Sequence, residues 1–232
     1  MTFIAVCLTA LVAPSSIWAA TPSEQLVSID KSNAKLIIYY PKYDSINLAC
    51  GATSPQNDPK AIFSCAAAFT SKCLSKFSHS NIDGEHVSSG KLYEGTDYPK
   101  DVFIWYKGKW KFVHRSNAIN ALNTAAANGG MGFRQYSLIL NGKKRPAFMT
   151  TSTVYRALCE LKGKLCIIES KTSIPLPDFI EELAKAGVTN AIYLDMGTWD
   201  HSWYRKSPSD SVTYIHKREH KYYTNWLTFY IK

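Results

Sequence analysis

A run of aromatic and polar residues near the end of the chain has the composition of a carbohydrate site. It follows Asp195 and Gly197 and consists of Trp199, Asp200, His201, Ser202, Trp203, Tyr204 and Arg205. Aromatic faces stack on sugar rings, and polar side chains bind sugar hydroxyls. The same composition also fits an aromatic-anchored loop in which Asp195 caps a turn, so both interpretations stay open.

Arg156 and Glu169 are expected to face each other across a hairpin. The segments 154–159 and 164–170 flank Lys162-Gly163. A symmetric turn pairs Cys159 with Cys166 and Arg156 with Glu169, and opposite residues have Cβ atoms about 4.5–5.5 Å apart. The two cysteines would be close enough to bridge. The alternative for Arg156 and Glu169 is a half-exposed structural ion pair, which contributes roughly 0–1 kcal/mol.

Other side-chain patterns predict less chemistry. His216 and His220 could share a helical face as metal ligands, but no third ligand is evident and Lys217 and Arg218 would repel a cation. We therefore expect neither a metal nor a cofactor. Serine-hydrolase chemistry has little support, because no serine has a nucleophile-elbow context.

The elements that must position these residues are mostly strands and hairpins. Hairpin turns are predicted at Lys107-Gly108 and Asn141-Gly142, and the first of these would pair Trp105 with Trp110 and Phe103 with Phe112. We expect further strands at 36–40, 61–69, 190–194 and 221–231, helices at 116–127 and 177–186, and a long loop at 79–97 that carries His86. The class is α+β, with one mainly antiparallel twisted sheet and two or three helices packed on it.

Residues 1–20 resemble a secretory signal. They contain no charged residue, and an apolar run from Phe3 to Ala13 leads to the small residues Ala19 and Ala20. We expect cleavage there, leaving a single domain at 21–232 that is periplasmic, at the cell surface or extracellular. The alternatives are a buried N-terminal helix and an uncleaved anchor. No later segment is apolar enough for a transmembrane span.

The charge and cysteine content limit the partners. The net charge is +9, with lysines spread along the chain as on a solvated face. No nucleic-acid motif accompanies this charge, so we expect no nucleic-acid partner, while an anionic substrate or envelope surface fits it. Five cysteines follow the predicted signal, and their odd number leaves at least one thiol unpaired. The sequence does not indicate the oligomeric state.

The order of elements from about residue 60 to 200 resembles the phosphodiester glycosidase family. A strand reaches a turn at Ser137-Leu138-Ile139-Leu140-Asn141-Gly142, an arginine opens a strand at Tyr155-Arg156-Ala157, and a strand ends Asn190-Ala191-Ile192-Tyr193-Leu194-Asp195-Met196-Gly197. Cys65 stands where the family has Asn, and Met196 where it has Gly. The chain therefore looks like a divergent, bacterial-type branch.

This resemblance implies a hydrolase that cleaves a sugar-1-phosphodiester or a related envelope glycan. The leaving phosphate monoester needs little protonation, so the site chiefly needs cations for the phosphate and a carboxylate for water or the oxocarbenium-like centre. The resemblance makes Asp195 the general base or nucleophile and Arg156 the phosphate-binding cation, while Glu169 orients Arg156 or shares the acid/base work. Trp199, His201, Trp203, His86 and Gly197 would contact the substrate. A non-catalytic glycan-binding envelope protein on the same fold is the alternative.

Overall fold

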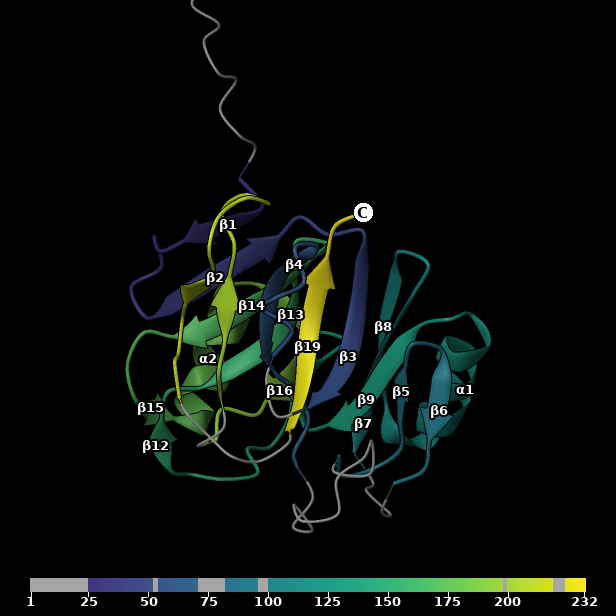
Figure 1. Cartoon of the computed structure of the whole chain (residues 1–232). Coiled ribbons are helices and arrows are strands. Elements are labelled where there is room, and N and C mark those ends of the chain that lie inside the picture. The colour runs from purple at the N-terminus through teal and green to yellow at the C-terminus, as the bar shows by residue number, and fades with distance from the viewer. Residues whose placement is uncertain (1–24, 52–53, 71–81, 96–99, 198–199, 219–223) are drawn as a thin grey trace, which may run out of the picture.

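An antiparallel sheet carries Arg156 and Glu169, and one of its strands leads to Asp195. The computed structural model describes residues 25–51, 54–70, 82–95, 100–197, 200–218 and 224–232. Within these ranges the largest sheet has seven strands in the order β1-β2-β14-β13-β16-β10-β11 (Figure 1). Its strands are β1 (Val27–Asp30), β2 (Leu36–Pro41), β10 (Ser137–Leu140), β11 (Lys143–Lys144), β13 (Arg156–Leu161), β14 (Lys164–Ser170) and β16 (Val188–Leu194).

Two further sheets, each of five described strands, complete the β-structure. The second has the order β18-β17-β4-β19-β3 and consists of β3 (Ser45–Gly51), β4 (Ala61–Ala66), β17 (Trp203–Tyr204), β18 (Thr213–Tyr214) and β19 (Thr224–Tyr230). The third has the order β6-β5-β9-β7-β8 and consists of β5 (His86–Ser88), β6 (Lys91–Tyr93), β7 (Asp101–Tyr106), β8 (Lys109–Val113) and β9 (Met131–Gln135). A short pair joins β12 (Ser152–Thr153) to β15 (Ile174–Pro175).

The predicted antiparallel α+β class is confirmed, but the expected single sheet is wrong. Alternation of apolar residues identifies a strand and a tight turn identifies its hairpin partner. Neither signal says which hairpins share hydrogen bonds with one another. In Figure 1 the strands β4, β19 and β3 run through the middle of the view as a sheet separate from β13 and β14 on its left.

The core lies between the three sheets. All three sheets contribute fully buried side chains to one apolar cluster, among them Phe63, Phe103, Phe133, Leu158, Ile192 and Phe229. The helix α2 (Leu176–Lys185) covers the other face of the seven-stranded sheet, and α1 (Ala118–Ala127) covers the other face of the third sheet. The seven-stranded sheet is thus covered on both faces, which is why side chains such as Arg156 are buried.

The predicted hairpins are confirmed. The turns Lys107-Gly108, Asn141-Gly142 and Lys162-Gly163 all have positive φ at both residues, with values from 48° to 74°. That conformation matches the right-handed twist of the flanking strands. The expected pairs Trp105–Trp110, Phe103–Phe112 and Arg156–Glu169 are all directly opposite.

Two local predictions were wrong. Part of the expected loop 79–97 is the hairpin of β5 and β6, which turns at Ser89-Gly90 with φ values of 48° and 75°. The helix expected at 116–127 begins only at Ala118, because a short 3₁₀ turn (Arg115–Asn117) precedes α1 and Asn117 occupies the cap position. The side chain of His114 accepts the Ser116 N–H in that turn.

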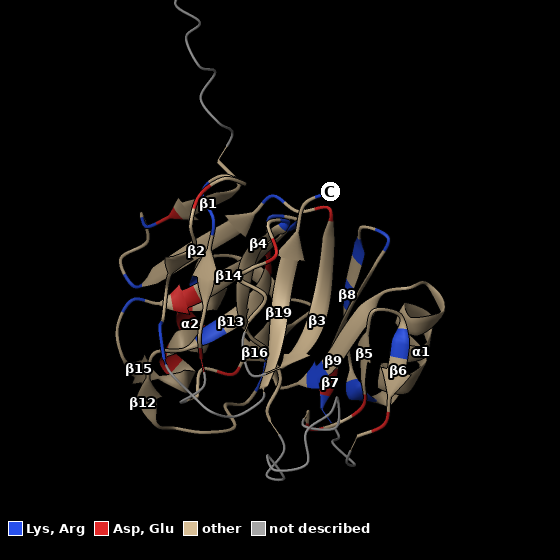
Figure 2. Ribbon diagram, in the orientation of Figure 1, with Lys and Arg blue, Asp and Glu red and all other residues tan. Residues whose placement is uncertain are grey.

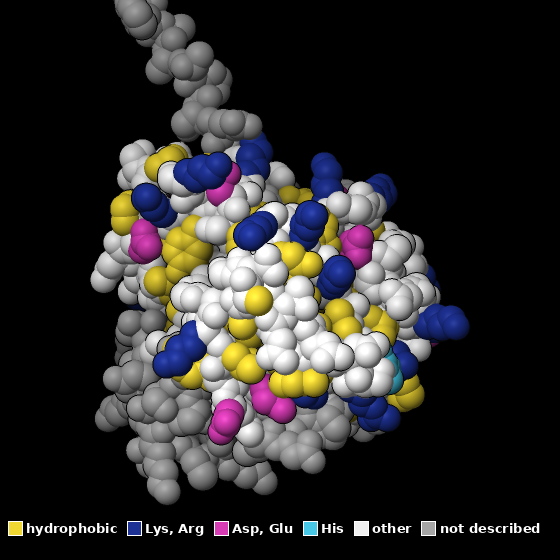
Figure 3. Space-filling view, turned by 90° about the vertical axis from the view of Figure 1, so that its right-hand side faces the viewer, with side chains coloured by type: hydrophobic (Ala, Val, Ile, Leu, Met, Phe, Trp, Pro, Cys, Tyr) yellow, Lys and Arg dark blue, Asp and Glu magenta, His cyan; other side chains and the backbone are white. Residues whose placement is uncertain are grey.

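Charged residues are dispersed over the molecule. More than half of the described Lys and Arg residues lie in turns and connections, and the rest lie on a minority of the strands and helices, such as β6, β8 and β11 (Figures 2 and 3). No helix in the described ranges is long and apolar enough to cross a membrane. The expected signal at residues 1–20 lies outside the described residues.

Cys159 and Cys166 lie directly opposite each other, as predicted, and both are buried thiols in this structure. Burial raises the pKa of Cys166 to about 12 and raises that of Cys159 well above its ordinary value. Because the thiolate is the species that reacts, a bridge should form only before the sheet closes. We expect a Cys159–Cys166 disulfide after refolding from urea with oxidised glutathione, detected by non-reducing peptide mapping.

The control is folded, reduced protein treated with the same oxidant, in which both thiols should persist. Recovery of both cysteines as free thiols after oxidative refolding would contradict the expectation.

Candidate functional site

The centre of the candidate site is the buried guanidinium of Arg156, at the start of β13. It has no exposed surface. Its Nε and Nη2 atoms donate to Oε2 of Glu169 at 3.0 and 2.7 Å, and Nη1 donates to Oδ1 of Asp200 at 2.9 Å. Nη2 also donates to the hydroxyl of Ser202 at 2.9 Å. The pair is therefore not half-exposed, as one interpretation of the sequence held, but is the interior of a hydrogen-bonded cluster.

The charges in this cluster hold one another ionised. Burial alone would lower the pKa of Arg156, yet the charges of Asp200 and Glu169 raise it well above its ordinary value. Burial alone would raise the pKa of Glu169, but Arg156 and a hydrogen bond from His216 hold it below its ordinary value. A buried charge without such partners would neutralise instead. Loss of any one charged member of the cluster would therefore leave another buried charge without its partner.

His216 connects the cluster to the outside of the protein. Its Nε2 atom lies 2.8 Å from Oε1 of Glu169, and its side chain is 24% exposed. The backbone N–H of His216 also donates to the carbonyl of Ser202. A carboxylate that holds one imidazole nitrogen fixes the orientation of the ring, which suits the other nitrogen to proton transfer.

Asp195 lies at the end of β16, in a turn beside this cluster. Its backbone N–H donates to the carbonyl of Ala67, just beyond β4, and its Oδ1 atom accepts the N–H of Gly197 at 3.0 Å. The carbonyl of Gly197 accepts the N–H of Asp200, the residue that holds Arg156. The turn is thus tied to both adjacent sheets and to the cluster.

An exposed cation borders the same turn. Nη1 of Arg218 donates to the carbonyls of Met196 and Gly197, at 3.3 and 2.9 Å. Arg218 is exposed, so its guanidinium borders the turn that follows Asp195 and contacts solvent. Because Arg218 contacts solvent and Arg156 does not, Arg218 is the planar cation that a dissolved anion can reach.

The structure separates the predicted substrate-binding residues. Trp203 belongs to β17, pairs with Ser64 of β4 and is fully buried, with its Nε1–H donating to the hydroxyl of Ser54. It therefore presents no face to a sugar in this structure. His201 is partly exposed and lies against the Tyr214 ring, with Nδ1 3.2 Å from the carbonyl of Arg218. His201 and Gly197 are the predicted contacts that lie at the Asp195 turn.

One other predicted contact, His86, is not at this turn. His86 is buried in β5, in the third sheet, where its ring stacks on Tyr93. Burial on that sheet does not support the expectation that it reaches substrate from a loop. Trp199 lies outside the described residues, as does His220.

Sequence reasoning did not assign their observed positions to three members of the site. Asp200 and Ser202 complete the Arg156 cluster, and Arg218 borders the Asp195 turn. Asp200 and Ser202 belong to the polar run that follows Asp195, but no pattern showed which of its side chains would turn inward, and Arg218 lies in a separate basic segment further along the chain. Cys65 also lies beside Arg156; burial raises the pKa of its thiol to about 12 although the guanidinium opposes the rise.

The arrangement provides a carboxylate, an oriented imidazole and an exposed guanidinium at one end of a sheet. These groups are suited to general acid–base catalysis, or to nucleophilic attack, on a negatively charged ligand. Among the described side chains, no three His, Cys, Asp or Glu residues gather as they would around a metal ion.

Arg156→Lys should destabilise the protein strongly. A lysine ammonium cannot reach Glu169, Asp200 and Ser202 together, and hydrogen bonds to charged groups contribute about 1.5–3 kcal/mol each. We expect the free energy of unfolding, measured by urea denaturation, to fall by roughly 3 kcal/mol. The exposed Arg115→Lys is the matched control and should stay near the wild-type value; equal stability of the two variants would contradict a structural role for the cluster.

The stability of the protein should depend on Glu169 at acid pH. Since the pKa of Glu169 is lower in the folded chain than in the unfolded chain, its contribution is complete above about pH 4.3, the ordinary value for Glu. It is lost as the pH falls through the lower folded value. When the pH is lowered from about 6 to about 3, the free energy of unfolding, measured by urea denaturation, should therefore fall less in Glu169→Gln than in the wild type. The exposed Glu181→Gln is the control, and parallel pH profiles for Glu169→Gln and wild type would contradict the assignment.

Comparison with known proteins finds solved structures with a similar fold but no match by sequence. No protein-family model matches the chain, and no curated protein matches it by sequence. The chain is similar to the catalytic domain of zebrafish N-acetylglucosamine-1-phosphodiester alpha-N-acetylglucosaminidase, a structure described as auto-inhibited by its pro-peptide. The TM-score is 0.61 at 15% identity, over 92% of this chain and 85% of that one.

A second solved structure, a hypothetical protein from Synechocystis, is similar with a TM-score of 0.58 at 11% identity. The match covers 89% of this chain and 61% of that one. At these identities the comparisons establish a distant resemblance in fold to a phosphodiester glycosidase domain.

Proposed function

We propose that this chain is a hydrolase that cleaves a sugar-1-phosphodiester or a related glycan at the Asp195 turn. The observation that carries the proposal is the contact series from Arg156 through Asp200 to the Asp195–Gly197 turn, which fixes a carboxylate beside an exposed guanidinium. The distant fold likeness to a glycosidase domain named for a sugar phosphodiester supports it. We further propose that the protein acts after export, in the periplasm or at the cell surface, as its N-terminal residues indicate.

In this proposal Asp195 acts on the sugar carbon. Its carboxylate either takes a proton from the attacking water or attacks the carbon directly, and the bond from that carbon to the phosphate oxygen breaks. The phosphate monoester departs with the bonding electrons as a stable anion, so little protonation of the leaving group is required. The Gly197 N–H donates to Oδ1 of Asp195 and so holds the carboxylate at the turn.

Arg218 takes the role first given to Arg156. Arg156 has no exposed surface and already donates to Glu169, Asp200 and Ser202, so in this mechanism it is a positioning residue. Arg218 is exposed beside the turn and is suited to the phosphate oxygens. His216, oriented by Glu169, supplies a proton-transfer group, and His201 is a further contact at the same turn.

The second candidate function is non-catalytic glycan binding on the same fold. The observation that favours it is that Arg156 donates hydrogen bonds to Glu169, Asp200 and Ser202, all of them inside the protein. A structural ion cluster of this kind would persist without any reaction at Asp195.

A turnover assay separates the two functions. On a panel of hexose-1-phosphate methyl diesters that includes the N-acetylglucosamine compound, we expect phosphate monoester release by the wild type. Asp195→Asn should lower kcat at least 100-fold, since it removes the reacting carboxylate, and Arg218→Gln should raise KM about tenfold, a loss of about 1.4 kcal/mol in binding.

The exposed carboxylate Asp178→Asn and the neighbouring cation Lys217→Gln are the matched controls. Calorimetric binding without turnover would favour the glycan-binding function, and wild-type kcat in Asp195→Asn would remove Asp195 from the mechanism.

A further inference from the structure

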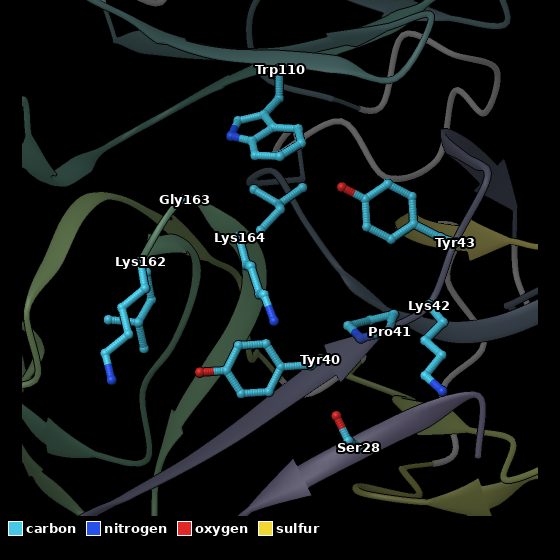
Figure 4. Close-up of a pocket in the computed structure, with 11 residues that line it drawn as sticks. Ser28, Tyr40, Pro41, Lys42, Tyr43, Trp110, Lys162, Gly163 and Lys164 are labelled. Atoms are coloured by element: carbon cyan, nitrogen blue, oxygen red, sulfur yellow. The ribbon is translucent and has the colours of Figure 1, made fainter. Parts of the chain in front are cut away.

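An open cavity of about 630 Å³ lies at the far end of β13 from Arg156 (Figure 4). It is formed by the strand pair β1–β2, the connection from β2 to β3, the turn between β13 and β14, and β8. Since β13 runs from Arg156 to Leu161, five residue steps of about 3.3 Å put the two ends about 17 Å apart. The cavity is therefore separate from the Asp195 turn, and its volume lies in the range of about 300–1,000 Å³ that is typical of small-molecule sites.

Three aromatic side chains form the walls of this cavity. Figure 4 shows Trp110 on one side, Tyr40 on the opposite side and Tyr43 between them at one edge. All three are partly buried. Trp110 and Tyr43 also pack against the core shared by the sheets, so the positions of both rings are fixed. Partly exposed, fixed aromatic faces are surfaces on which sugar rings stack.

Three lysines give the cavity a positive charge. Lys42, Lys162 and Lys164 are exposed, and none of the described lining residues is Asp or Glu. Lys42 follows β2, whereas Lys162 and Lys164 flank Gly163 in the turn. Figure 4 shows these lysines spread around the cavity, with Lys42 and Lys162 on opposite sides. Spread cations match a ligand whose negative charges are repeated along its length.

We propose that this cavity binds an acidic oligosaccharide, independently of any reaction at Asp195. The sugar rings lie on Trp110 and the tyrosines, and the acidic groups of successive sugars meet the lysines. A nucleotide also combines a flat ring with negative charge, but it concentrates that charge on adjoining phosphates. The separation of Lys42 from Lys162 favours charge carried on successive rings.

The test is titration calorimetry of the full chain with tetragalacturonate. Its methyl ester presents the same rings without charge, and ATP serves as the nucleotide probe. We expect tetragalacturonate to bind at least tenfold more tightly than the ester. Lys162→Gln/Lys164→Gln should weaken its binding at least tenfold, and Trp110→Leu should weaken both sugar ligands, with melting curves to confirm that each variant is folded.

The chain supplies a matched control for the charge change. Lys107-Gly108-Lys109 is the same tripeptide in the same kind of hairpin turn, and neither lysine lines the cavity. Lys107→Gln/Lys109→Gln should therefore bind as the wild type does. The proposal is overturned if the two double variants bind tetragalacturonate alike, if the ester binds as well as the acid, if tetragalacturonate does not bind, or if ATP alone binds and depends on Lys162 and Lys164.

Discussion

A guanidinium without solvent contact needs hydrogen-bond acceptors inside the protein. This requirement determines how the chain folds around the start of β13. Arg156 meets it with Glu169 on the neighbouring strand and with Asp200 and Ser202 from a segment more than forty residues later. Desolvating such charges is costly, and only a complete set of hydrogen bonds offsets that cost. The polar segment after β16 must therefore fold back onto the sheet, and Asp195, Gly197 and Arg218 are positioned as a consequence.

The two ends of β13 differ because of what covers them. At the Arg156 end, charges are buried and paired, which favours a fixed geometry suited to a reaction. At the Leu161 end, lysines and aromatic rings stay in contact with solvent around a cavity, which favours binding of an extended, charged ligand. One hairpin thus connects a proposed reaction site to a proposed binding site without requiring that either depend on the other.

The sequence predicted local pairings well and long-range packing poorly. Arg156–Glu169 followed from counting outward from Lys162-Gly163, because a two-residue turn sets the register of its hairpin. No comparable rule brings Asp200 to Arg156, since that contact depends on how an irregular segment returns to the sheet. Trp203 was expected to contact sugar, yet it pairs with β4 and is buried. Aromatic residues serve cores and binding sites equally well, so composition alone could not decide between the two.

Amide hydrogen exchange on Asp200→Asn tests most directly whether the Arg156 cluster holds the segment after β16 in place. Removing one charge from the cluster weakens its hold on residues 200–216 while leaving the β7–β8 hairpin untouched. We expect faster exchange at the amides of Ile215 and His216, which both donate to the carbonyl of Ser202, and unchanged exchange at Phe103 and Phe112. Unchanged exchange throughout, or an equal increase in both regions, would contradict the account.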